Sequence, residues 1–597
     1  MKNQNITKVL VANRGEIAVR ILHATKELGI ESFSIFSEDD RDALHAAASD
    51  HSLALDGEGP SAYLDSDRII SLALESECTA IHPGYGFLSE DAAFSSQCIS
   101  AGLTWIGPGP DVLKLFGEKN RARAFSEALG IPTPKGTNQA IDLKGALDFM
   151  ESLQGTPMVL KAVSGGGGRG IRVVREVSRL EEAFKRSASE ALGAFGNADL
   201  YAEVWLDQVR HIEVQVAGDG TGDIAVLGER ECTLQRRRQK LIEIAPSPSI
   251  DDEFRDVLFN AARTICSAAN FQNLGTVEFL IKNSDSSPSN SDPYVFIEVN
   301  PRIQVEHTVT EEIFGIDLVK TQLAIAGGSS LLELGLAPGE EPSPRGRSIQ
   351  IRVNCERLNQ SGEIFPASGS LDKFETPKGR GIRVETAAYT NYEPNPRFDS
   401  LLAKLIASTP SGSYKDLLAL GRRAIRDLRV EGIETNASFL LNILAAEDVI
   451  NNQIHTGFIE ERFSDLLEHK TDKESSVPPV KNIQSTSLAG AQLDTDDPLA
   501  VLDYGKQTSD LKAGNDIYDT ESEGHETIFA PMQGTIIDIA VDIGDIVRQG
   551  DSLLIMEAMK MEHVIVASES GLIQELTISK GDTVREGSPL ARIEKRE

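Results

Sequence analysis

The chain contains few cysteines, no long apolar run and too few basic residues to balance its acidic ones. The five cysteines among its 597 residues are scattered, odd in number, and at spacings that match no metal-ligand pattern. Cysteines placed in this way indicate a reducing compartment and no disulfide framework. They are Cys78, Cys98, Cys232, Cys266 and Cys355.

A membrane-spanning helix needs a run of about 18 or more apolar residues, and the sequence has none. The start of the chain, Met-Lys-Asn-Gln-Asn-Ile-Thr-Lys, also lacks the apolar core of a secretory signal. We therefore expect a soluble protein of the cytoplasm. The mitochondrial matrix stays open as an alternative, although no clear transit peptide is present.

The deficit of positive charge limits the classes of partner. A formal net charge of -32 would repel phosphates, which excludes nucleic acid and anionic membrane as main partners. Any polyanionic substrate therefore needs a local basic pocket. A hydrophobic content of 40% supports full cores, and the length predicts several domains of roughly 100–200 residues each.

A repeat marks the C-terminal end of the sequence. Its alternating segments at 535–541 and 571–576 predict half-buried strands separated by Gly-Asp turns. Two similar sheets in a small sandwich or flattened barrel would result. The glycines Gly534, Gly544 and Gly550 recur 37 residues later as Gly571, Gly581 and Gly587.

Lys560 falls between the two halves, in Ile-Met-Glu-Ala-Met-Lys-Met-Glu-His. A lysine at a hairpin tip is usually a solvated charge, but its Met559 and Met561 neighbours do not fit a solvated pattern. The segment, with Ala-Pro-Met at 530–532, resembles biotin carboxyl carrier domains, and this implies biotin attached to Lys560 by a biotin protein ligase. Lipoyl domains share the fold but typically have Asp-Lys-Ala at these positions, so we rank lipoylation well below biotinylation.

The N-terminal segment begins with a strand, a glycine turn and a helical pattern, which opens a doubly wound α/β sheet. No GxGxxG occurs, so a dinucleotide is not indicated. Residues 11–18, Val-Ala-Asn-Arg-Gly-Glu-Ile-Ala, and 82–90, His-Pro-Gly-Tyr-Gly-Phe-Leu-Ser-Glu, are similar to signatures of biotin carboxylases. The resemblance extends from about Lys8 to Glu460.

Residues 157–175 predict two strands joined by a glycine loop. Such a loop can offer backbone N–H groups to a triphosphate, and it is not a Walker A motif because no Gly-Lys-Ser/Thr opens a helix. It resembles the phosphate loop of ATP-grasp enzymes. The resemblance implies phosphate contacts from Lys161 and Lys119, and a loop that includes Gly166 and Gly167.

Further nucleotide contacts are implied by the same resemblance. Glu203 and the backbone of Leu206 would contact the adenine region, His211 the nucleotide, and Gln235 the ribose side. In the basic stretch 235–240, Lys240 would meet bicarbonate. Arg238 departs from the family, which commonly has His or Asn there, so its role stays open.

Two apolar segments, 275–280 and 295–300, each present a glutamate. Burying two carboxylates is costly unless a cation neutralises them. Magnesium takes oxygen ligands, typically one or two carboxylates with nucleotide phosphates. Glu278 and Glu298, with Asn300 close by, are therefore candidate ligands of Mg²⁺, or of Mn²⁺ in its place.

The segment 300–311, Asn-Pro-Arg-Ile-Gln-Val-Glu-His-Thr-Val-Thr-Glu, matches the biotin carboxylase active site. The match implies that Arg302 binds bicarbonate through its planar guanidinium, beside Gln304 and the Val305 backbone. Glu306 is the candidate base, because bicarbonate must lose a proton before it attacks. Two further matches imply that Arg352 stabilises the biotin enolate and that Asp399 lines the biotin pocket.

The expected architecture has four folded parts and a tether. Residues 1–115 form the α/β N-terminal domain, 116–330 an ATP-grasp α+β domain, 331–464 the biotin carboxylase C-terminal domain, and 527–597 an all-β biotinyl domain. Residues 465–526 are rich in Ser, Thr, Asp, Gly and Pro, which predicts a flexible linker.

The resemblance as a whole is to the α-chain of a biotin-dependent acyl-CoA carboxylase, of acetyl- or propionyl-CoA type. It implies biotin, ATP, Mg²⁺ and bicarbonate, an oligomer, and a separate carboxyltransferase β-subunit that handles the acyl-CoA. Alternatives are a subunit of a split pyruvate or urea carboxylase. A non-catalytic carrier protein is disfavoured by the full set of catalytic candidates.

Overall fold

A computed structural model describes residues 6–163, 170–282, 292–359, 364–468, 525–532, 534–558, 561–584 and 587–595. The chain divides into two compact units, a large one that ends near residue 471 and a small C-terminal one. Each unit is described by itself. In the described residues, none of the helices is long and apolar enough to cross a membrane.

The N-terminal part of the large unit is a parallel five-stranded sheet in the order β3-β2-β1-β4-β5, which confirms the predicted α/β class. Helix α1, Gly15–Glu27, follows β1 directly. The strands are β1 Lys8–Val11, β2 Glu31–Phe36, β3 His51–Ala54, β4 Ala80–His82 and β5 Thr104–Trp105, and further helices are α2 Leu44–Ala48, α3 Ser66–Glu75, α4 Ala92–Ser100 and α5 Pro110–Gly117.

The loop after β4 is locked against the loop after β1. Asn13 Nδ2 donates to the carbonyls of Pro83 and Tyr85, at 2.6 and 2.8 Å. Gly84 lies between them at φ +64°, and a Cβ there would come within 2.8 Å of the Asn13 amide. Only glycine fits this close approach without strain. The two signature segments of the sequence are therefore neighbours in space.

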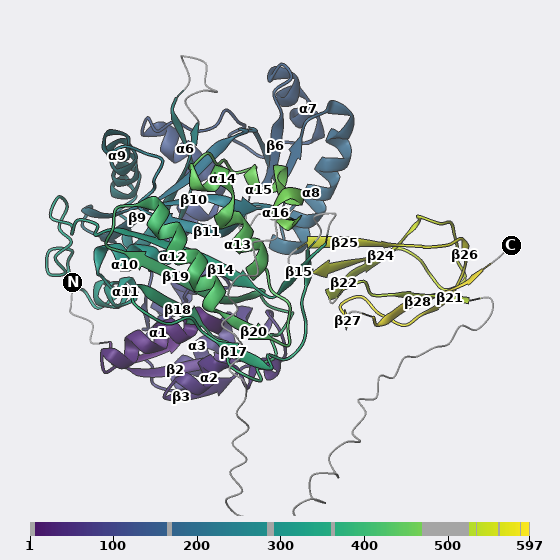
Figure 1. Ribbon diagram of the computed structural model, residues 1–597, viewed down its shortest axis with the longest axis horizontal. Coiled ribbons are helices and arrows are strands. Elements are labelled where there is room, and N and C mark those ends of the chain that lie inside the picture. Colours follow the sequence, from purple (N-terminus) through teal and green to yellow (C-terminus); the bar gives the residue numbers. More distant parts are fainter. Residues whose placement is uncertain are drawn as a thin grey trace, which may run out of the picture. The chain divides into compact units, whose positions relative to one another are not determined.

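A smaller lobe contains the antiparallel sheet β7-β6-β8, which lies beside α7 and α8 in Figure 1. The four-glycine segment between β6 and β7, with Gly166 and Gly167, falls outside the described residues. The elements are β6 Met158–Ala162, β7 Arg172–Val174, β8 Leu200–Val204, α6 Lys119–Ala128, α7 Leu143–Ser152 and α8 Leu180–Phe195.

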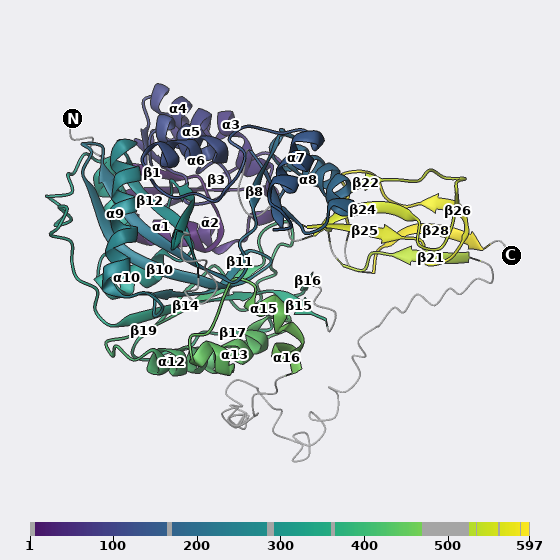
Figure 2. The same ribbon diagram turned by 90° about the horizontal axis from the view of Figure 1, so that it is seen from above.

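The centre of the large unit is an eight-stranded antiparallel sheet in the order β13-β12-β9-β10-β11-β14-β19-β18 (Figure 2). Pairing of β11 with β14 joins the two segments that were predicted as separate ATP-grasp and C-terminal domains. The strands are β9 Val209–Asp219, β10 Ile224–Arg236, β11 Gln239–Ala245, β12 Gln272–Lys282, β13 Tyr294–Asn300, β14 Arg347–Asn354, β18 Ile382–Thr386 and β19 Leu401–Thr409.

Both faces of this sheet are covered. Helix α9, Asp252–Ala268, packs on β9 and β10, while α10, His307–Phe314, packs on β10, β11, β14 and β19. Consequently β9 is buried along nearly its whole length instead of presenting one solvated face. Its polar residues must find partners inside the protein. Further helices are α11 Leu318–Ala326, α12 Tyr414–Asp427, α13 Ala437–Ala445, α14 Glu447–Ile450, α15 Phe458–Glu461 and α16 Phe463–Glu468.

The small unit shows the predicted repeat as two four-stranded sheets, β21-β28-β26-β23 and β25-β24-β22-β27. Gly544 and Gly581, the corresponding turn glycines of the two halves, have φ values of +99° and +95°. The strands are β21 His525–Phe529, β22 Gly534–Ile539, β23 Ile546–Val547, β24 Ser552–Ala558, β25 Met561–Val566, β26 Gly571–Leu576, β27 Thr583–Val584 and β28 Pro589–Lys595.

Two predicted features lie wholly or mostly outside the described residues. Lys560 falls between β24 and β25, where residues 559–560 are not described. Of the predicted linker 465–526, residues 469–524 are not described; α16 continues to Glu468, and β21 begins at His525.

Candidate active site

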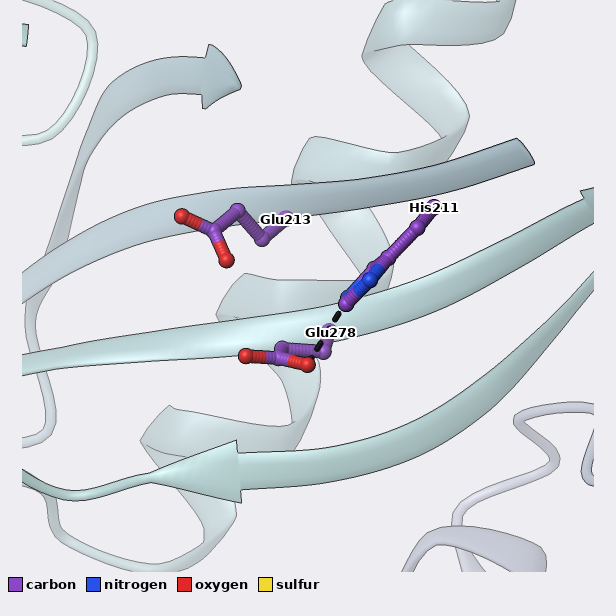
Figure 3. Close-up of side chains that lie close together, drawn as sticks. All are labelled: His211, Glu213 and Glu278. Carbon is purple, nitrogen blue, oxygen red and sulfur yellow. Dashed lines mark hydrogen bonds and ion pairs between the residues drawn. The ribbon is translucent and has the colours of Figure 1, made fainter. Parts of the chain in front are cut away.

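The neighbouring strands β9 and β12 place three chemical groups on one face of the sheet (Figure 3). His211 and Glu213 are two residues apart on β9, so their side chains point the same way. Glu278 of β12 is directly opposite Glu213, and its carboxylate accepts a 2.8 Å hydrogen bond from His211 Nε2 if that nitrogen is protonated. All three side chains are buried.

Lys240, at the start of β11, is the cation of this cluster. Its Nζ lies 2.5 Å from Glu213, 3.2 Å from Glu278 and 2.7 Å from Glu306. Burial works against the charged ammonium, but the surrounding carboxylates outweigh it and hold the pKa of Lys240 well above its ordinary value. The amine therefore stays charged and binds three acids together.

Glu306 is fully buried at the start of α10 and lies between two cations. Its second carboxylate oxygen accepts a 3.0 Å hydrogen bond from Arg352 Nη2. Burial would raise the pKa of Glu306, yet Lys240, Arg352 and Arg230 lower it well below the ordinary value. The carboxylate is thus ionised and oriented by ion pairs on both sides.

Arg352 on β14 is shared between two acids. Besides Glu306 it contacts Glu243 of β11, to which its Nε donates at 2.5 Å. The other Glu243 oxygen accepts from Gln350 at 3.1 Å. The arginine is therefore fixed across the strand pair that joins the ATP-grasp and C-terminal segments.

Arg230 supports the cluster from beneath. Its side chain is completely buried on β10 and donates to Glu213 at 2.5 Å, Gln215 at 2.7 Å and Thr310 at 2.8 Å. Its Nη2 also donates to Thr276 of β12 at 3.1 Å, and an arginine with four partners in the interior holds β9, β10, β12 and α10 in a fixed relation. This fixes the carboxylate that holds Lys240.

Arg302 lies on the segment between β13 and α10. It forms an ion pair with Glu90 of the N-terminal domain, and its Nη1 donates to Gln304 Oε1 at 3.2 Å. Gln304 Nε2 in turn donates to Glu278 at 3.3 Å. The predicted bicarbonate contacts Arg302, Gln304 and Lys240 are thus joined through hydrogen bonds around one carboxylate.

Two ion pairs hold the predicted nucleotide contacts. Lys119, at the start of α6, pairs with Glu298 of β13, and Lys161 of β6 pairs with Glu203 of β8. Burial alone would raise the pKa of Glu298, and the Lys119 charge lowers it below the ordinary value. The Lys161 charge also lowers the pKa of Glu298, so the two ion pairs act on each other.

The candidate metal ligands face one another. Glu278 and Glu298 are register partners on β12 and β13. Asn300 Nδ2 donates to both, at 2.9 and 3.3 Å, so one small side chain reaches both carboxylates. An all-oxygen set of this kind fits Mg²⁺. The group His211, Glu213 and Glu278 is also close enough to hold an ion, but Lys240 already neutralises its carboxylates.

A small cavity lies where the N-terminal and C-terminal domains meet. Asp399, Glu16 and Arg14 line it together with Tyr392 and Asn395. This places Asp399, predicted for the biotin pocket, at a cavity wall.

Glu16 connects that cavity with the segment that carries Glu306. Its carboxylate accepts a hydrogen bond from the Tyr85 hydroxyl and lies 2.9 Å from Lys404 Nζ. Lys404 is fully buried and donates to the Val305 carbonyl at 3.0 Å. The backbone of Val305, next to Glu306, is therefore held by a charged network that begins at the cavity.

The remaining predicted residues border the nucleotide side. Leu206 follows β8, and Gln235 is the last residue but one of β10. Arg238, at the tip of the β10–β11 hairpin with φ +66°, donates to the Ile171 carbonyl at 3.0 Å and lies over the Trp205 ring. It thus bridges the hairpin and the small lobe.

Sequence reasoning missed several charged residues of this cluster. Glu213, Arg230, Glu243 and Lys404 are all buried, and each lies within a strand. For Glu213, Glu243 and Lys404 the available signal was a charged residue between two apolar ones, because such groups are rarely buried unless paired. Arg230, which follows one glutamate and precedes another, gave no such signal.

The sequence matches four known families over most of its length. Residues 5–113 match the biotin carboxylase N-terminal domain, and residues 118–334 match the ATP-binding domain of the carbamoyl-phosphate synthase L chain. Residues 350–461 match the biotin carboxylase C-terminal domain, and residues 526–593 match the family described as biotin-requiring enzyme.

Two similar proteins illustrate the range of relatives. The biotin-dependent acyl-coenzyme A carboxylase alpha3 subunit of Mycobacterium leprae is 36% identical over 584 residues, covering 95% of each chain. The pyruvate carboxylase of Staphylococcus aureus is also 36% identical, and the chain spans only 50% of its length while 92% of the chain is covered.

Among solved structures, the biotin carboxylase domain of Hydrogenobacter thermophilus 2-oxoglutarate carboxylase gives a TM-score of 0.72 at 38% identity. It covers 77% of this chain and 98% of that domain. That structure was determined with MgADP, ADP and bicarbonate.

Proposed function

The chain belongs to the biotin-dependent carboxylases, as a biotin carboxylase fused to a biotin carrier domain, and we propose that it carboxylates its own carrier biotin with ATP and bicarbonate. ATP and bicarbonate are the substrates of this reaction, Mg²⁺ is its metal, and biotin is the group that receives the carboxyl. The carrier lysine is Lys560.

The observation that carries the proposal is the buried group of Glu306, Lys240 and Arg352. Glu306 accepts the proton of bicarbonate, and a bicarbonate oxygen then attacks the γ-phosphorus of ATP. The bond to the bridging oxygen breaks, which yields ADP and carboxyphosphate. Carboxyphosphate separates into CO₂ and phosphate. When bound, biotin would supply the ring nitrogen that takes up the CO₂, with the phosphate as acceptor of the proton that this nitrogen gives up.

The surrounding residues bind and orient the reactants. Lys240 and Arg302 offset the negative charge of bicarbonate, with Gln304 and the Val305 backbone beside them. Arg352, aimed at Glu306 at 3.0 Å, stabilises the charge that develops on the ureido oxygen of biotin when its nitrogen is deprotonated. Asp399 lines the cavity where biotin enters.

The nucleotide contacts come from the two ion pairs, Lys119 with Glu298 and Lys161 with Glu203, and from neighbouring residues. Lys119 and Lys161 turn to the phosphates, Glu203 and Leu206 contact the adenine region, and His211 and Gln235 lie on the base and ribose side. Glu278, Glu298 and Asn300 would hold Mg²⁺. When bound, Mg²⁺ neutralises charge on the phosphate oxygens as the γ-phosphoryl group is transferred.

The acceptor of the carboxyl group is an acyl-CoA, handled by a carboxyltransferase on a separate chain. Support comes from the carboxylase alpha3 subunit of M. leprae, which matches this chain over 95% of both lengths. The chain spans half the length of the S. aureus pyruvate carboxylase. The second candidate is a split enzyme whose acceptor is pyruvate. It is favoured because the S. aureus pyruvate carboxylase is 36% identical to this chain, as is the M. leprae alpha3 subunit.

The test of the first half-reaction measures ADP release by the purified chain with ATP, Mg²⁺, bicarbonate and free biotin. Biotin should stimulate ADP release, and labelled bicarbonate should enter biotin. Absence of both activities in folded protein that binds ATP would overturn the proposal.

Carrier attachment is tested by avidin blotting and intact mass after expression with a biotin protein ligase. Lys560→Ala should remove the avidin signal, whereas Lys580→Ala, an exposed lysine of the same domain paired with Asp538, should keep it. Avidin signal in the Lys560→Ala variant would show that another lysine carries biotin. Acyl-CoA and pyruvate acceptors are then compared with the co-purified partner chain.

A further inference from the structure

One wall of the small cavity is anchored to the N-terminal domain by the Asp39 carboxylate, which has no role in the proposed reaction. Asp39 lies in the short helix Glu38–Asp40, after β2. Its partners Asn395 and Arg397 lie in the segment that leads to Asp399.

Asp39 accepts hydrogen bonds from both sides of this junction. On its own domain, Oδ1 accepts from Ser37 Oγ at 2.7 Å and from the Gly59 N–H at 2.9 Å. Across the junction, Oδ2 accepts from Asn395 Nδ2 at 2.9 Å and from Arg397 Nη1 at 3.4 Å. Burial alone would raise the pKa of Asp39, and these donors together lower it below the ordinary value.

The anchored segment is further fixed at each of its residues. Asn395 Oδ1 accepts from the Arg397 N–H at 3.1 Å, and Arg397 Nη1 also pairs with Glu58 at 2.5 Å. A Cβ on Gly59 would lie 3.2 Å from Arg397 Cδ, so the arginine packs directly on the glycine. Phe398 lies under the Arg14 guanidinium at 3.8 Å.

Arg14 lines the same cavity and is itself held by the next acid. It donates to Asp40 through Nε and Nη2, at 2.5 and 2.8 Å. Asp39 and Asp40 are therefore adjacent in sequence and orient opposite parts of the cavity wall. One carboxylate holds the segment before Asp399, and the other holds Arg14.

An exposed ion pair contributes little, but Asp39 differs from one in two respects. Its side chain is 17% exposed, against 52% for Glu58, which contacts the same arginine. The Asp39 carboxylate also accepts from the Asn395 amide as well as from the Arg397 guanidinium. Two donors fix the orientation of the 395–397 segment as well as its distance from Asp39. Loss of Asp39 should therefore move residues 395–399 more than loss of Glu58.

We propose that Asp39 is a positioning residue for biotin: through Asn395 and Arg397 it sets the place of Asp399 at the cavity wall. This rests on the proposed function, in which that cavity admits biotin. Asp39 touches none of the reacting groups, so its removal should weaken biotin binding and leave ATP binding unaltered.

The test is Asp39→Asn in the full chain, assayed for biotin-stimulated ADP release with free biotin. The amide keeps an acceptor for Ser37 and Gly59 but turns a donor toward Asn395 and Arg397. We expect KM for biotin to rise about 10-fold, as for the loss of about 1.4 kcal/mol, while KM for ATP changes less than 2-fold. Asp42→Asn is the matched control, because only its backbone carbonyl accepts the Tyr389 hydroxyl.

Rescue separates positioning from general damage. In Asp39→Asn with Asn395→Asp, the donor and acceptor exchange sides and the contact is restored, so KM for biotin should return to within about 3-fold of the wild type. Asn395→Asp alone places two carboxylates together and should raise KM at least as much as Asp39→Asn.

The outcomes also keep this inference apart from the proposed function. If the wild type lacks biotin-stimulated ADP release, the proposed function fails. If the wild type is active and Asp39→Asn leaves KM for biotin unchanged, Asp39 is not a positioning residue. Equal losses toward ATP and biotin without rescue by the double variant would overturn the inference in the same way.

Discussion

The two ends of the site use the same chemical groups in opposite ways. At the reaction end, Glu306 is fully buried and contacts two cations, Lys240 and Arg352, each of which has a further acid. At the nucleotide end, Lys119 forms one ion pair, with Glu298, which also accepts a 3.3 Å hydrogen bond from Asn300; the two side chains of the pair remain 15% and 23% exposed. If one cation is removed, Glu306 still has an ion pair with the other. If Glu298 is removed, Lys119 loses its ion pair.

This difference matches the tasks of the two ends. A catalytic carboxylate must keep its orientation through the reaction, so redundant partners are useful. In the proposed function Lys119 would turn to phosphate and Glu298 to Mg²⁺, so the two side chains would have to release one another when MgATP binds. One ion pair within the protein is then replaced by two ion pairs with the ligand, lysine with phosphate and glutamate with Mg²⁺, so the local net charge changes little. The nucleotide end is therefore a pair of sites that neutralise each other until the ligand arrives.

Glu306→Gln tests the reaction end and should have the largest effect. Removing a positioned acid–base group typically costs about 10²–10⁴-fold in rate, so biotin carboxylation should fall by that factor while KM for ATP changes little. Lys240 keeps Glu213 and Glu278, and Arg352 keeps Glu243, so the protein should stay folded. Unchanged bicarbonate-dependent ADP release would show that another group is the base.

Lys119→Gln tests the nucleotide end. We expect KM for ATP to rise about 10-fold, as for loss of one charged hydrogen bond of about 1.5 kcal/mol or more, with KM for biotin unchanged. Isothermal titration with ATP and Mg²⁺ measures the same loss directly. Lys114→Gln, on the preceding helix, is the matched control. An equal loss of biotin affinity would contradict the separation of the two ends.

The sequence yielded candidate residues for both ends of the site. At the nucleotide end, Glu278 and Glu298 were proposed from their positions within short apolar segments, and Lys119 and Lys161 from the resemblance to ATP-grasp enzymes. Their mutual pairing was not predictable, because it depends on strand register across distant segments.

At the reaction end, sequence reasoning proposed Glu306, Lys240 and Arg352 but not the residues that pair with them. Glu243 contacts Arg352, and Arg230 contacts the Glu213 carboxylate that holds Lys240, only because β9, β10, β11 and β14 are neighbours in a sheet that crosses the predicted domain boundary. Likewise the alternation of polar and apolar residues in β9 does not indicate that both faces are buried, which follows from the helices on each side of the sheet. Tertiary neighbours of this kind leave no local signal.

Arg238→His should have a smaller effect than either substitution above. Arg238 bridges the β10–β11 hairpin and the small lobe through the Ile171 carbonyl, on the exposed edge of the nucleotide end. Loss of one exposed hydrogen bond should raise KM for ATP by about 2–5-fold, corresponding to roughly 0.5–1 kcal/mol. Arg186→Gln, an exposed arginine of α8 paired with Glu182, is the control. A rise above about 20-fold would show that Arg238 contacts the nucleotide directly.

The smallest expected effect is that of pH on the reaction end. The pKa of Glu306 lies well below its ordinary value of about 4.5, because Lys240 and Arg352 offset the cost of burial. A depressed carboxyl pKa contributes stability that is present above the unfolded value and is lost only as the pH falls toward the folded value. Between pH 6 and 8 Glu306 therefore stays ionised in the free enzyme, and its titration should change kcat/KM for bicarbonate less than 2-fold. The measurement holds the bicarbonate concentration constant at each pH and repeats the profile in His211→Asn, which removes the imidazole beside Glu278. A 10-fold rise from pH 6 to 8 that persists in His211→Asn would mean that Glu306 is protonated in the free enzyme, and that the reaction end is no more redundantly paired than the nucleotide end.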